Sequence, residues 1–280
     1  MTRLLPDLFD ALLFDLDGVI YVGPTAVQGA VAGVAAAQAQ GLTTSFVTNN
    51  ASRTPFEVAS HLRGLGIRLK DSDVVTSSEA GTRLIAGFVA PGSRILAIGG
   101  PGVRAALLAG GFQPVHSLED DPCAVLQGIG MELAWRDLAE ATFAVAAGLP
   151  WVATNMDSTF PTARGLAPGN GSMVAAVSHA TGRVPNAVGG KPEPALLAEA
   201  IDRAGARRPL MIGDRLDTDI AAGSRLGIPT LLILTGVTDR SILSAARGDE
   251  IPTYVADDLT CLNPGASWDD LRWTGEYREE

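Results

Sequence analysis

Cysteine and lysine are both scarce in this chain of 280 residues. Cys123 and Cys261 are its only cysteines, which excludes a disulfide-rich scaffold and fits a reducing compartment. We therefore expect a cytoplasmic location. Of the 21 basic residues, only Lys70 and Lys191 are lysines, and the others are arginines. A lysine is thus a rare choice in this sequence, and the surroundings of each one are informative.

Basic residues are also fewer than acidic residues. The 21 basic residues stand against 31 acidic ones, giving a formal net charge of −10. Nucleic-acid binding depends on neutralising phosphates, so a nucleic-acid partner is not expected. Charged residues make up 19% of the chain and hydrophobic residues 46%, a balance that excludes a disordered chain.

Long apolar runs are absent as well. The sequence contains no stretch of about 18 uncharged apolar residues, so neither a membrane-spanning helix nor a membrane partner is expected. The first ten residues lack the apolar stretch of a signal peptide and already contain Asp7 and Asp10.

What the sequence does contain is an alternation of short apolar runs with alanine-rich stretches. Strand-like runs occur at 11–14, 43–47, 94–98 and 209–212, and a helical stretch follows each of them. A further run at 230–234 leads to Thr235-Gly236. Thr54, Pro55 and Glu57 form a typical helix start, with a cap, a proline in the first turn and a capping box. This alternation predicts an α/β protein with mainly parallel sheets, and the length suggests two domains of roughly 150 residues.

In a sheet of this kind, ligands bind at the carboxyl ends of the strands. The polar residues that follow the predicted strands are therefore the candidate site, and they are Asp15, Asp17, Thr48, Asn49, Asn50, Lys191, Asp214 and Asp219. Each of them alone has an ordinary interpretation as a strand end, a helix cap or a surface residue. Together they provide four carboxylates, a hydroxyl, two amides and an ammonium.

This set suits phosphoryl transfer. Carboxylates after buried strands can hold Mg²⁺, which prefers oxygen ligands. One aspartate can attack phosphorus, and a second one, two residues further on, can protonate the leaving oxygen. Thr48 and the amides after it can hold phosphate oxygens. Lys191 follows Gly189-Gly190 and precedes Pro192, which indicates a rigid loop where a compact ammonium is needed.

The motifs in this order resemble those of the haloacid dehalogenase superfamily of phosphatases. The matching segments are Asp15-Leu16-Asp17-Gly18, Val47-Thr48-Asn49-Asn50, Gly190-Lys191-Pro192 and Gly213-Asp214-Arg215-Leu216-Asp217-Thr218-Asp219. Their form and spacing resemble the NagD-like branch, which includes p-nitrophenyl, pyridoxal, phosphoglycolate and glycerol-3-phosphate phosphatases. Thr154-Asn155-Met156-Asp157 is also similar to that branch.

The resemblance implies a role for each residue of the site. Asp15 would be the nucleophile and a Mg²⁺ ligand, and Asp17 the general acid and base, binding Mg²⁺ through its carbonyl. Asp214 would be the remaining side-chain ligand of the metal, and Asp219 would orient Lys191 or the metal-bound waters.

A second group of residues would handle the substrate. By the same resemblance, Thr48 and Asn49 bind the phosphate. Asn50 and Lys191 are further candidates for binding the phosphate or the substrate. Asn155 and Asp157 are candidates for contact with phosphate or substrate.

The resemblance also implies the domain organisation. A doubly wound, Rossmann-like core would comprise residues 1–80 and 186–280, with an acidic tail from about 265. A smaller α/β cap domain, inserted at 81–185, would cover the site and select the leaving group. Dimers formed through the cap occur in related phosphatases, so the resemblance leaves room for a homodimer.

We therefore expect a Mg²⁺-dependent phosphomonoesterase that acts on a small phosphorylated metabolite through an aspartyl-phosphate. Glycerol 3-phosphate, or a similar polyol or sugar phosphate, is the favoured substrate; phosphoglycolate, pyridoxal phosphate and nucleoside monophosphates are alternatives. Receiver domains of signalling proteins share a phospho-accepting aspartate, but they lack an acid two residues after it. The presence of Asp17 and of the long insertion therefore argues against a receiver domain. A metal-dependent glycosyl transferase would leave Thr48, Lys191 and Asp214 unexplained. A non-catalytic protein that binds a phosphorylated metabolite is the remaining alternative.

Overall fold

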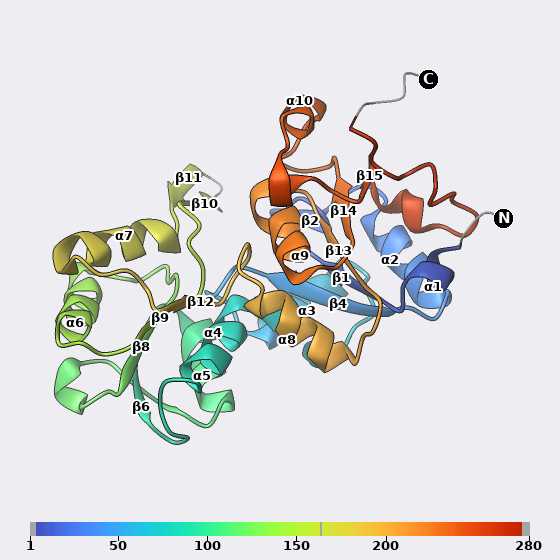
Figure 1. The fold of residues 1–280 in the computed structure, drawn as a ribbon. Helices are drawn as coiled ribbons and strands as arrows, with labels where there is room; N and C mark the ends of the chain where they lie inside the picture. Colours follow the sequence, from blue (N-terminus) through green and yellow to red (C-terminus); the bar gives the residue numbers. More distant parts are fainter. Residues whose placement is uncertain (1–3, 163, 276–280) are drawn as a thin grey trace. The chain divides into compact units, whose positions relative to one another are not determined.

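The computed structural model describes residues 4–162 and 164–275 (Figure 1). Within these residues the chain forms two compact units. The first contains residues 4–47, 59–74 and 191–275, and the second contains residues 48–58 and 75–190. The chain thus passes between the units four times. The boundaries predicted from the sequence lie at 81 and 185, and the predicted core domain includes the segment 48–58.

A six-stranded sheet with the order β15-β14-β13-β1-β4-β5 forms the centre of the first unit. Its strands are β1 (Ala11–Phe14), β4 (Thr43–Thr48), β5 (Val74–Thr76), β13 (Pro209–Gly213), β14 (Thr230–Ile233) and β15 (Tyr254–Ala256). β1 pairs in parallel with both β4 and β13, so that Phe14 lies opposite Phe46 on one side and Ile212 on the other. The strand order therefore reverses at β1, and ligands of such sheets bind at the carboxyl ends of the strands beside the reversal.

Helices cover both faces of this sheet. Consecutive residues of a strand point to opposite faces, and Leu12, Leu13 and Phe14 are all fully buried. The helices along this part of the chain are α1 (Leu5–Leu8), α2 (Ala30–Ala39), α3 (Pro55–Gly64), α8 (Ala195–Ala204), α9 (Ala221–Leu226) and α10 (Arg240–Ser244). A small hairpin of β2 (Tyr21–Val22) and β3 (Thr25–Ala26) follows β1. Short 3-10 segments lie at Asp71–Asp73, Gly248–Glu250 and Leu259–Leu262.

α3 begins where the sequence predicts. The Thr54 hydroxyl accepts a hydrogen bond from the backbone N–H of Glu57 (3.2 Å), and the Glu57 carboxylate accepts one from the N–H of Thr54 (2.8 Å). Pro55 is the first residue of the helix, where the absence of an N–H costs nothing. The capping box is therefore confirmed.

The second unit is an α/β unit with its own parallel sheet, of order β12-β9-β8-β6-β7. Its strands are β6 (Arg94–Ile98), β7 (Gln113–Val115), β8 (Ala124–Gln127), β9 (Trp151–Ala153) and β12 (Ala187–Val188), and its helices are α4 (Ser77–Ile85), α5 (Pro101–Ala109), α6 (Trp135–Ala146) and α7 (Asn170–Thr181). An antiparallel hairpin, β10 (Thr159–Thr162) and β11 (Gly165–Pro168), precedes α7, and a 3-10 segment lies at Leu118–Asp120.

The two faces of this second sheet have separate cores. Ile95 packs with Ile85 of α4 and Leu107 of α5, whereas the next residue, Leu96, packs with Ala144 of α6 and Val174 of α7. The alternation along β6 therefore places α4 and α5 on one face and α6 and α7 on the other. Both units are doubly wound, which confirms the predicted fold class.

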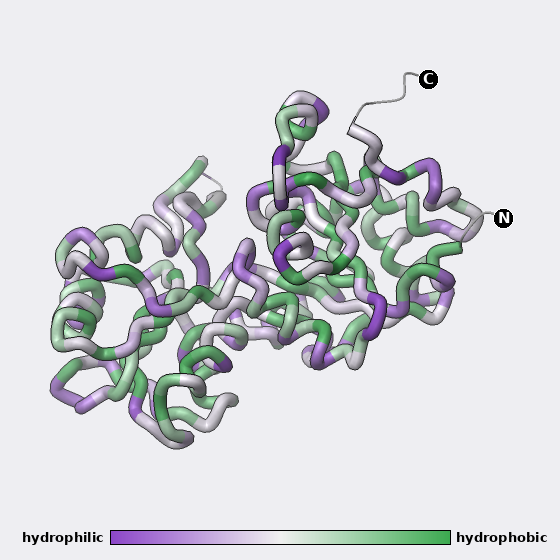
Figure 2. Tube along the Cα trace, in the orientation of Figure 1, coloured by the Kyte–Doolittle hydropathy of each residue, from purple (hydrophilic) through white to green (hydrophobic). Residues whose placement is uncertain are grey.

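The last described segment packs onto the first unit. Trp268 is 1% exposed and contacts the rings of Phe9 and Tyr254 edge to face, at centroid distances of 5.4 and 5.2 Å. Residues 276–280 of the predicted acidic tail lie outside the described residues. Hydrophobic and hydrophilic segments alternate along the trace in Figure 2. None of the helices in the described part of the chain has the length and apolar character that a bilayer crossing requires.

Candidate active site

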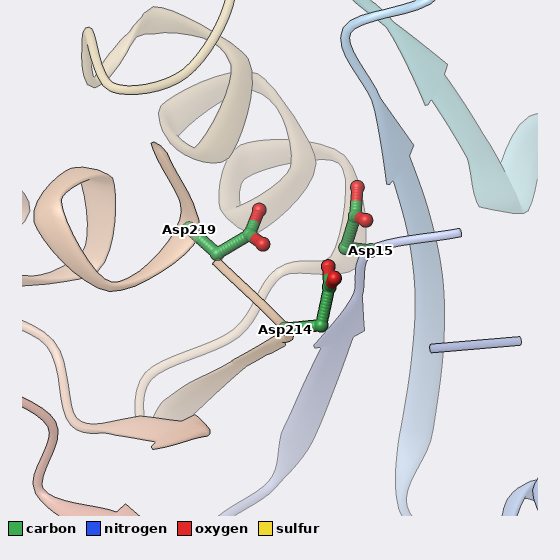
Figure 3. Close-up of side chains that lie close together, drawn as sticks. All are labelled: Asp15, Asp214 and Asp219. Carbon is green, nitrogen blue, oxygen red and sulfur yellow. The ribbon is translucent and has the colours of Figure 1, made fainter. Parts of the chain in front are cut away.

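Three aspartates of the first unit converge at the point where the strand order reverses. Asp15 directly follows β1, Asp214 directly follows its neighbour β13, and Asp219 lies in a π-helical turn, Leu216–Ile220. One carboxylate oxygen from each of them lies within 4.8 Å of the others. Figure 3 shows the three side chains lying close together. Oxygen atoms in such a group are the ligands that Mg²⁺ prefers.

The position of Asp219 depends on a glycine and on the π turn. A Cβ atom on Gly213 would lie 2.2 Å from the Cβ of Asp219, so only glycine lets the turn fold back over the end of β13. The N–H of Ile220 donates to the carbonyl of Arg215 (3.2 Å), five residues back, which defines the π turn. The N–H of Arg215 donates to Asp219 Oδ2 (3.1 Å). Asp219 is therefore buried, whereas Asp217 of the same turn is exposed and pairs with Arg215.

Asp214 is fixed by the loop that follows β14. Its Oδ2 atom accepts a hydrogen bond from the N–H of Val237 (2.7 Å). Cβ atoms on Gly18 and Gly236 would lie 2.6 and 2.0 Å from that oxygen. Within the described residues, the buried Oδ1 atom has no hydrogen-bond partner. A buried carboxylate oxygen without a partner is costly, and a bound cation would satisfy it.

Lys191 joins two of the three carboxylates. Its ammonium group forms an ion pair with Asp15 and a second one with Asp219 Oδ1 (2.7 Å). The side chain is only 2% exposed, so both ion pairs are shielded from water. The lysine that the sequence singles out is therefore buried among acidic groups, whereas Lys70 is exposed.

Burial shapes the protonation of this group. It raises the pKa of Asp15 well above its ordinary range, and Asp219 and Asp214 raise it further while Lys191 opposes them. Burial, followed by the charge of Asp219, raises the pKa of Asp214 to about 7. Burial would lower the pKa of Lys191, but the charges of Asp15 and Asp219 raise it, so the ammonium stays protonated. The carboxylates outnumber the ammonium, and the residues present therefore fit a divalent cation.

Asp17 lies apart from this group of carboxylates. It is exposed, in the turn after β1 where the N–H of Gly18 donates to the carbonyl of Tyr21 (2.9 Å). Its side chain is not part of the three-carboxylate group found among the described residues.

The other predicted site residues lie in the second unit, or at its start. Thr48 is the last residue of β4 and is 3% exposed. Its hydroxyl accepts a hydrogen bond from the N–H of Asn50 (3.0 Å), and the Asn50 side chain accepts two from Ser52. These contacts form a tight polar turn directly after the strand.

Asn49, Asn155 and Asp157 are brought together. The Asn49 amide donates to the Asp157 carboxylate (3.2 and 3.3 Å), and the Asn155 amide donates to the carbonyl of Asn49 (2.7 Å). The predicted phosphate loop and the predicted substrate-contact loop are thus hydrogen-bonded to each other.

Sequence reasoning missed the residues that support the acids. The Thr235 hydroxyl donates to the carbonyl of Gly18 (2.7 Å), and Gly236 and Val237 surround Asp214. A signal was available, because Thr235 and Gly236 lie just beyond the end of β14, a strand of the same sheet. Their residue types gave no indication of this role, because they support Asp214 through a backbone N–H group and through the small size of glycine.

Comparisons with known proteins agree on one family. Residues 12–113 match the family described as haloacid dehalogenase-like hydrolase, and residues 188–262 match a second family description of the same kind. The D-glycerol 3-phosphate phosphatase of Mycobacterium tuberculosis is 47% identical over 254 residues, 91% of this chain and 71% of that protein. An acid sugar phosphatase of Staphylococcus aureus is 35% identical over 254 residues, 90% of this chain and 95% of that protein.

Solved structures give the same result. A crystal structure of glycerol phosphate phosphatase from Mycobacterium tuberculosis, in complex with magnesium, has a TM-score of 0.91 and 45% identity, covering 97% of this chain and 81% of that chain. The p-nitrophenyl phosphatase from Archaeoglobus fulgidus has a TM-score of 0.82 and 30% identity, covering 90% of this chain and 97% of that chain.

Proposed function

The chain belongs to the haloacid dehalogenase-like hydrolases, and on that premise we propose that it is a Mg²⁺-dependent phosphomonoesterase that hydrolyses glycerol 3-phosphate. The family prediction made from the four motifs is confirmed. The observation that carries the proposal is the group of Asp15, Asp214 and Asp219 around Lys191, at the reversal point of the sheet. The glycerol phosphate phosphatase relative supports the substrate.

Asp15 is the proposed nucleophile. Its carboxylate oxygen attacks phosphorus, the Asp15–phosphorus bond forms and the ester bond to the leaving alcohol breaks. Asp17 gives its proton to the departing oxygen. In the second step Asp17 takes a proton from water, the water oxygen bonds to phosphorus, and the bond to Asp15 breaks. The exposure of Asp17 suits a group that exchanges protons with solvent.

Asp15, Asp214 and the carbonyl of Asp17 are the proposed holders of Mg²⁺. When bound, the ion would offset the negative charge of the phosphate oxygens. The buried Oδ1 atom of Asp214 supports this assignment, because it has no hydrogen-bond partner among the described residues and a bound cation would satisfy it. Asp219 acts through Lys191, whose ammonium it shares with Asp15.

Thr48, Asn49 and Asn50 are the proposed phosphate-binding residues, together with Lys191. Thr48 ends β4, and Asn49 and Asn50 form the turn directly after it. β4 is the parallel neighbour of β1, and Asp15 directly follows β1. The second unit, residues 48–58 and 75–190, is proposed as the cap domain. Its role in selecting the leaving group, a homodimer and the cytoplasmic location all stay predictions.

A hydrolysis screen tests the proposal. Purified protein with Mg²⁺ is assayed for phosphate release from glycerol 3-phosphate, phosphoglycolate, pyridoxal phosphate, a nucleoside monophosphate and p-nitrophenyl phosphate. We expect the highest kcat/KM for glycerol 3-phosphate, loss of activity with excess EDTA and recovery when Mg²⁺ is restored. A higher kcat/KM for another metabolite would make that metabolite the assigned substrate in place of glycerol 3-phosphate. Hydrolysis that continues without metal would overturn the mechanism.

A further inference from the structure

The loop that follows β4 is held by side chains from distant parts of the second unit. The carbonyl of Asn49 accepts hydrogen bonds from the Ser77 hydroxyl (2.6 Å) and from the Asn155 amide (2.7 Å). The Asn49 amide donates to both carboxylate oxygens of Asp157. The next turn of the loop is also held, since the Ser78 hydroxyl donates to the carbonyl of Ala51 (3.2 Å). Backbone and side chain of Asn49 are thus both fixed.

Asn155 and Asp157 are themselves anchored. The Asn155 side-chain oxygen accepts the N–H of Asp157 (3.1 Å), and the Asn155 carbonyl accepts the amide of Asn170 (2.8 Å). The carbonyl of Asp157 accepts the N–H of Gly171 (2.9 Å). The loop 154–157 is therefore attached to the start of α7, the twelve-residue helix Asn170–Thr181.

The junction is tightly packed at Gly190. A Cβ atom there would lie 2.6 Å from Asn49 Oδ1, 2.7 Å from the Thr154 carbonyl and 3.0 Å from the Asn155 Cβ. Only glycine allows three chain segments to meet at this spacing. Gly190 immediately precedes Lys191 in the chain.

These side chains are poorly suited to hold the substrate themselves. Asn155 is 3% exposed, and both ends of its amide are hydrogen-bonded to backbone groups of the protein. Asp157 is an acid, and a carboxylate repels a phosphate dianion. Its hydrogen bonds with the Asn49 amide give it another use, which is to hold that amide in one orientation.

We propose that Asp157 and Asn155 are positioning residues that orient Asn49 for phosphate binding and do not contact the substrate. The proposal rests on the proposed phosphatase function. It replaces the expectation from the sequence that these two residues contact phosphate or substrate. Because Asn49 would hold the phosphoryl group, which all substrates share, losing this support affects every phosphate ester alike.

The test compares Asp157→Ala with the conservative Asp157→Asn. We measure kcat and KM for glycerol 3-phosphate and p-nitrophenyl phosphate, and the inhibition constant of inorganic phosphate. Asp157→Ala should lower kcat/KM for both esters by the same factor, roughly tenfold to hundredfold, as for loss of a hydrogen bond to a charged group. It should also weaken phosphate inhibition. Asp157→Asn keeps an oxygen that accepts from Asn49 and should restore most of the activity.

A double-mutant cycle and a matched control complete the test. Asn49→Ala and Asp157→Ala should be far from additive, since both remove the same interaction. Asp137→Ala is the control, because Asp137 also accepts a backbone hydrogen bond within the second unit, from Ala134 (2.7 Å) at the start of α6. That variant should leave kcat/KM within twofold of the wild type.

Hydrogen exchange provides a readout that does not depend on activity. Amides of residues 48–53 should exchange faster in Asp157→Ala than in the wild type, and at nearly the wild-type rate in Asp157→Asn. If Asp157→Ala impairs only one of the two esters, Asp157 touches the leaving group and the proposal is wrong. Unchanged kinetics or strict additivity with Asn49→Ala would overturn it too. A wild-type protein that hydrolyses no phosphate ester would instead refute the proposed function, with exchange still testing the loop contact.

Discussion

Gly236 packs directly against Asp214, so closely that a Cβ atom on the glycine would lie 2.0 Å from the Oδ2 atom of the acid. This contact links the loop after β14 to the proposed metal ligand. Gly236→Ala should therefore displace the Asp214 carboxylate and raise the Mg²⁺ concentration needed for half-maximal activity at least tenfold. The strain should also lower the free energy of unfolding by about 1–3 kcal/mol.

The control for this prediction is Gly64→Ala. No atom lies within 4 Å of a Cβ built there, and Gly64 ends α3, where alanine is acceptable. Mg²⁺ titrations of phosphatase activity and chemical denaturation check both variants. If Gly236→Ala and Gly64→Ala need the same Mg²⁺ concentration for half-maximal activity, the Gly236 contact does not determine the position of Asp214.

Lys191 carries a prediction that uses the scarcity of lysine. Lys191→Met would leave the buried Asp219 and the half-buried Asp15 without their shared cation, and removing one partner of a buried ion pair costs about 3–5 kcal/mol. We expect a large loss of stability in the metal-free protein, partly recovered with Mg²⁺, and loss of activity even when Mg²⁺ is present. Lys191→Arg should also be impaired, because the broad guanidinium group does not fit between the two carboxylates.

Lys70→Met is the matched control, since Lys70 is exposed. Its denaturation midpoint and its kcat/KM should equal those of the wild type. A Lys191→Met protein that is as stable as Lys70→Met would mean that the buried ion pairs contribute nothing measurable.

Much of the site follows from the sequence because it lies at strand ends. The run 11–14 is apolar throughout, as expected of a strand buried on both faces, and Asp15 then falls at its carboxyl end. The same reasoning places Thr48 and Asp214 after their strands. Strand order at the reversal point brings Asp15 and Asp214 together, and general rules for α/β sheets are sufficient to expect that.

Other features depend on contacts that leave no local trace in the sequence. Asp217 and Asp219 have similar neighbours, and only the π turn and the space above Gly213 decide that Asp219 is buried. The segment 48–58 joins the second unit through hydrogen bonds from Ser77 and Asn155, residues 28 and 106 positions away from Asn49. No composition change marks that boundary.

The raised pKa of Asp214 predicts pH-dependent metal binding. Metal binding needs the deprotonated carboxylate, so the affinity for Mg²⁺ should increase as pH rises through about 7. Below that pH, the binding of Mg²⁺ should release a proton from Asp214. In the metal-free protein, the folded state keeps this proton to a higher pH than the unfolded chain does. The stability contribution of the group is therefore fully present below about pH 4 and is lost as pH rises toward 7.

Calorimetric Mg²⁺ titrations at pH 6 and pH 8, in buffers of different ionisation enthalpy, check the proton release. Asp214→Asn is the comparison, because its side chain keeps the shape and cannot titrate. An Mg²⁺ affinity that is the same at both pH values in the wild type would contradict the prediction.

Asp15→Asn tests the nucleophile. The amide cannot form an acyl phosphate, so turnover of p-nitrophenyl phosphate should fall by roughly three orders of magnitude or more. The fold should survive, because the change replaces a half-buried acid whose pKa burial has already raised. Asp217→Asn is the matched control, since this acid lies in the turn beside Asp219 but is exposed and pairs only at the surface with Arg215. It should keep activity within twofold of the wild type, whereas Asp15→Asn activity within a few-fold of the wild type would exclude Asp15 as the attacking group.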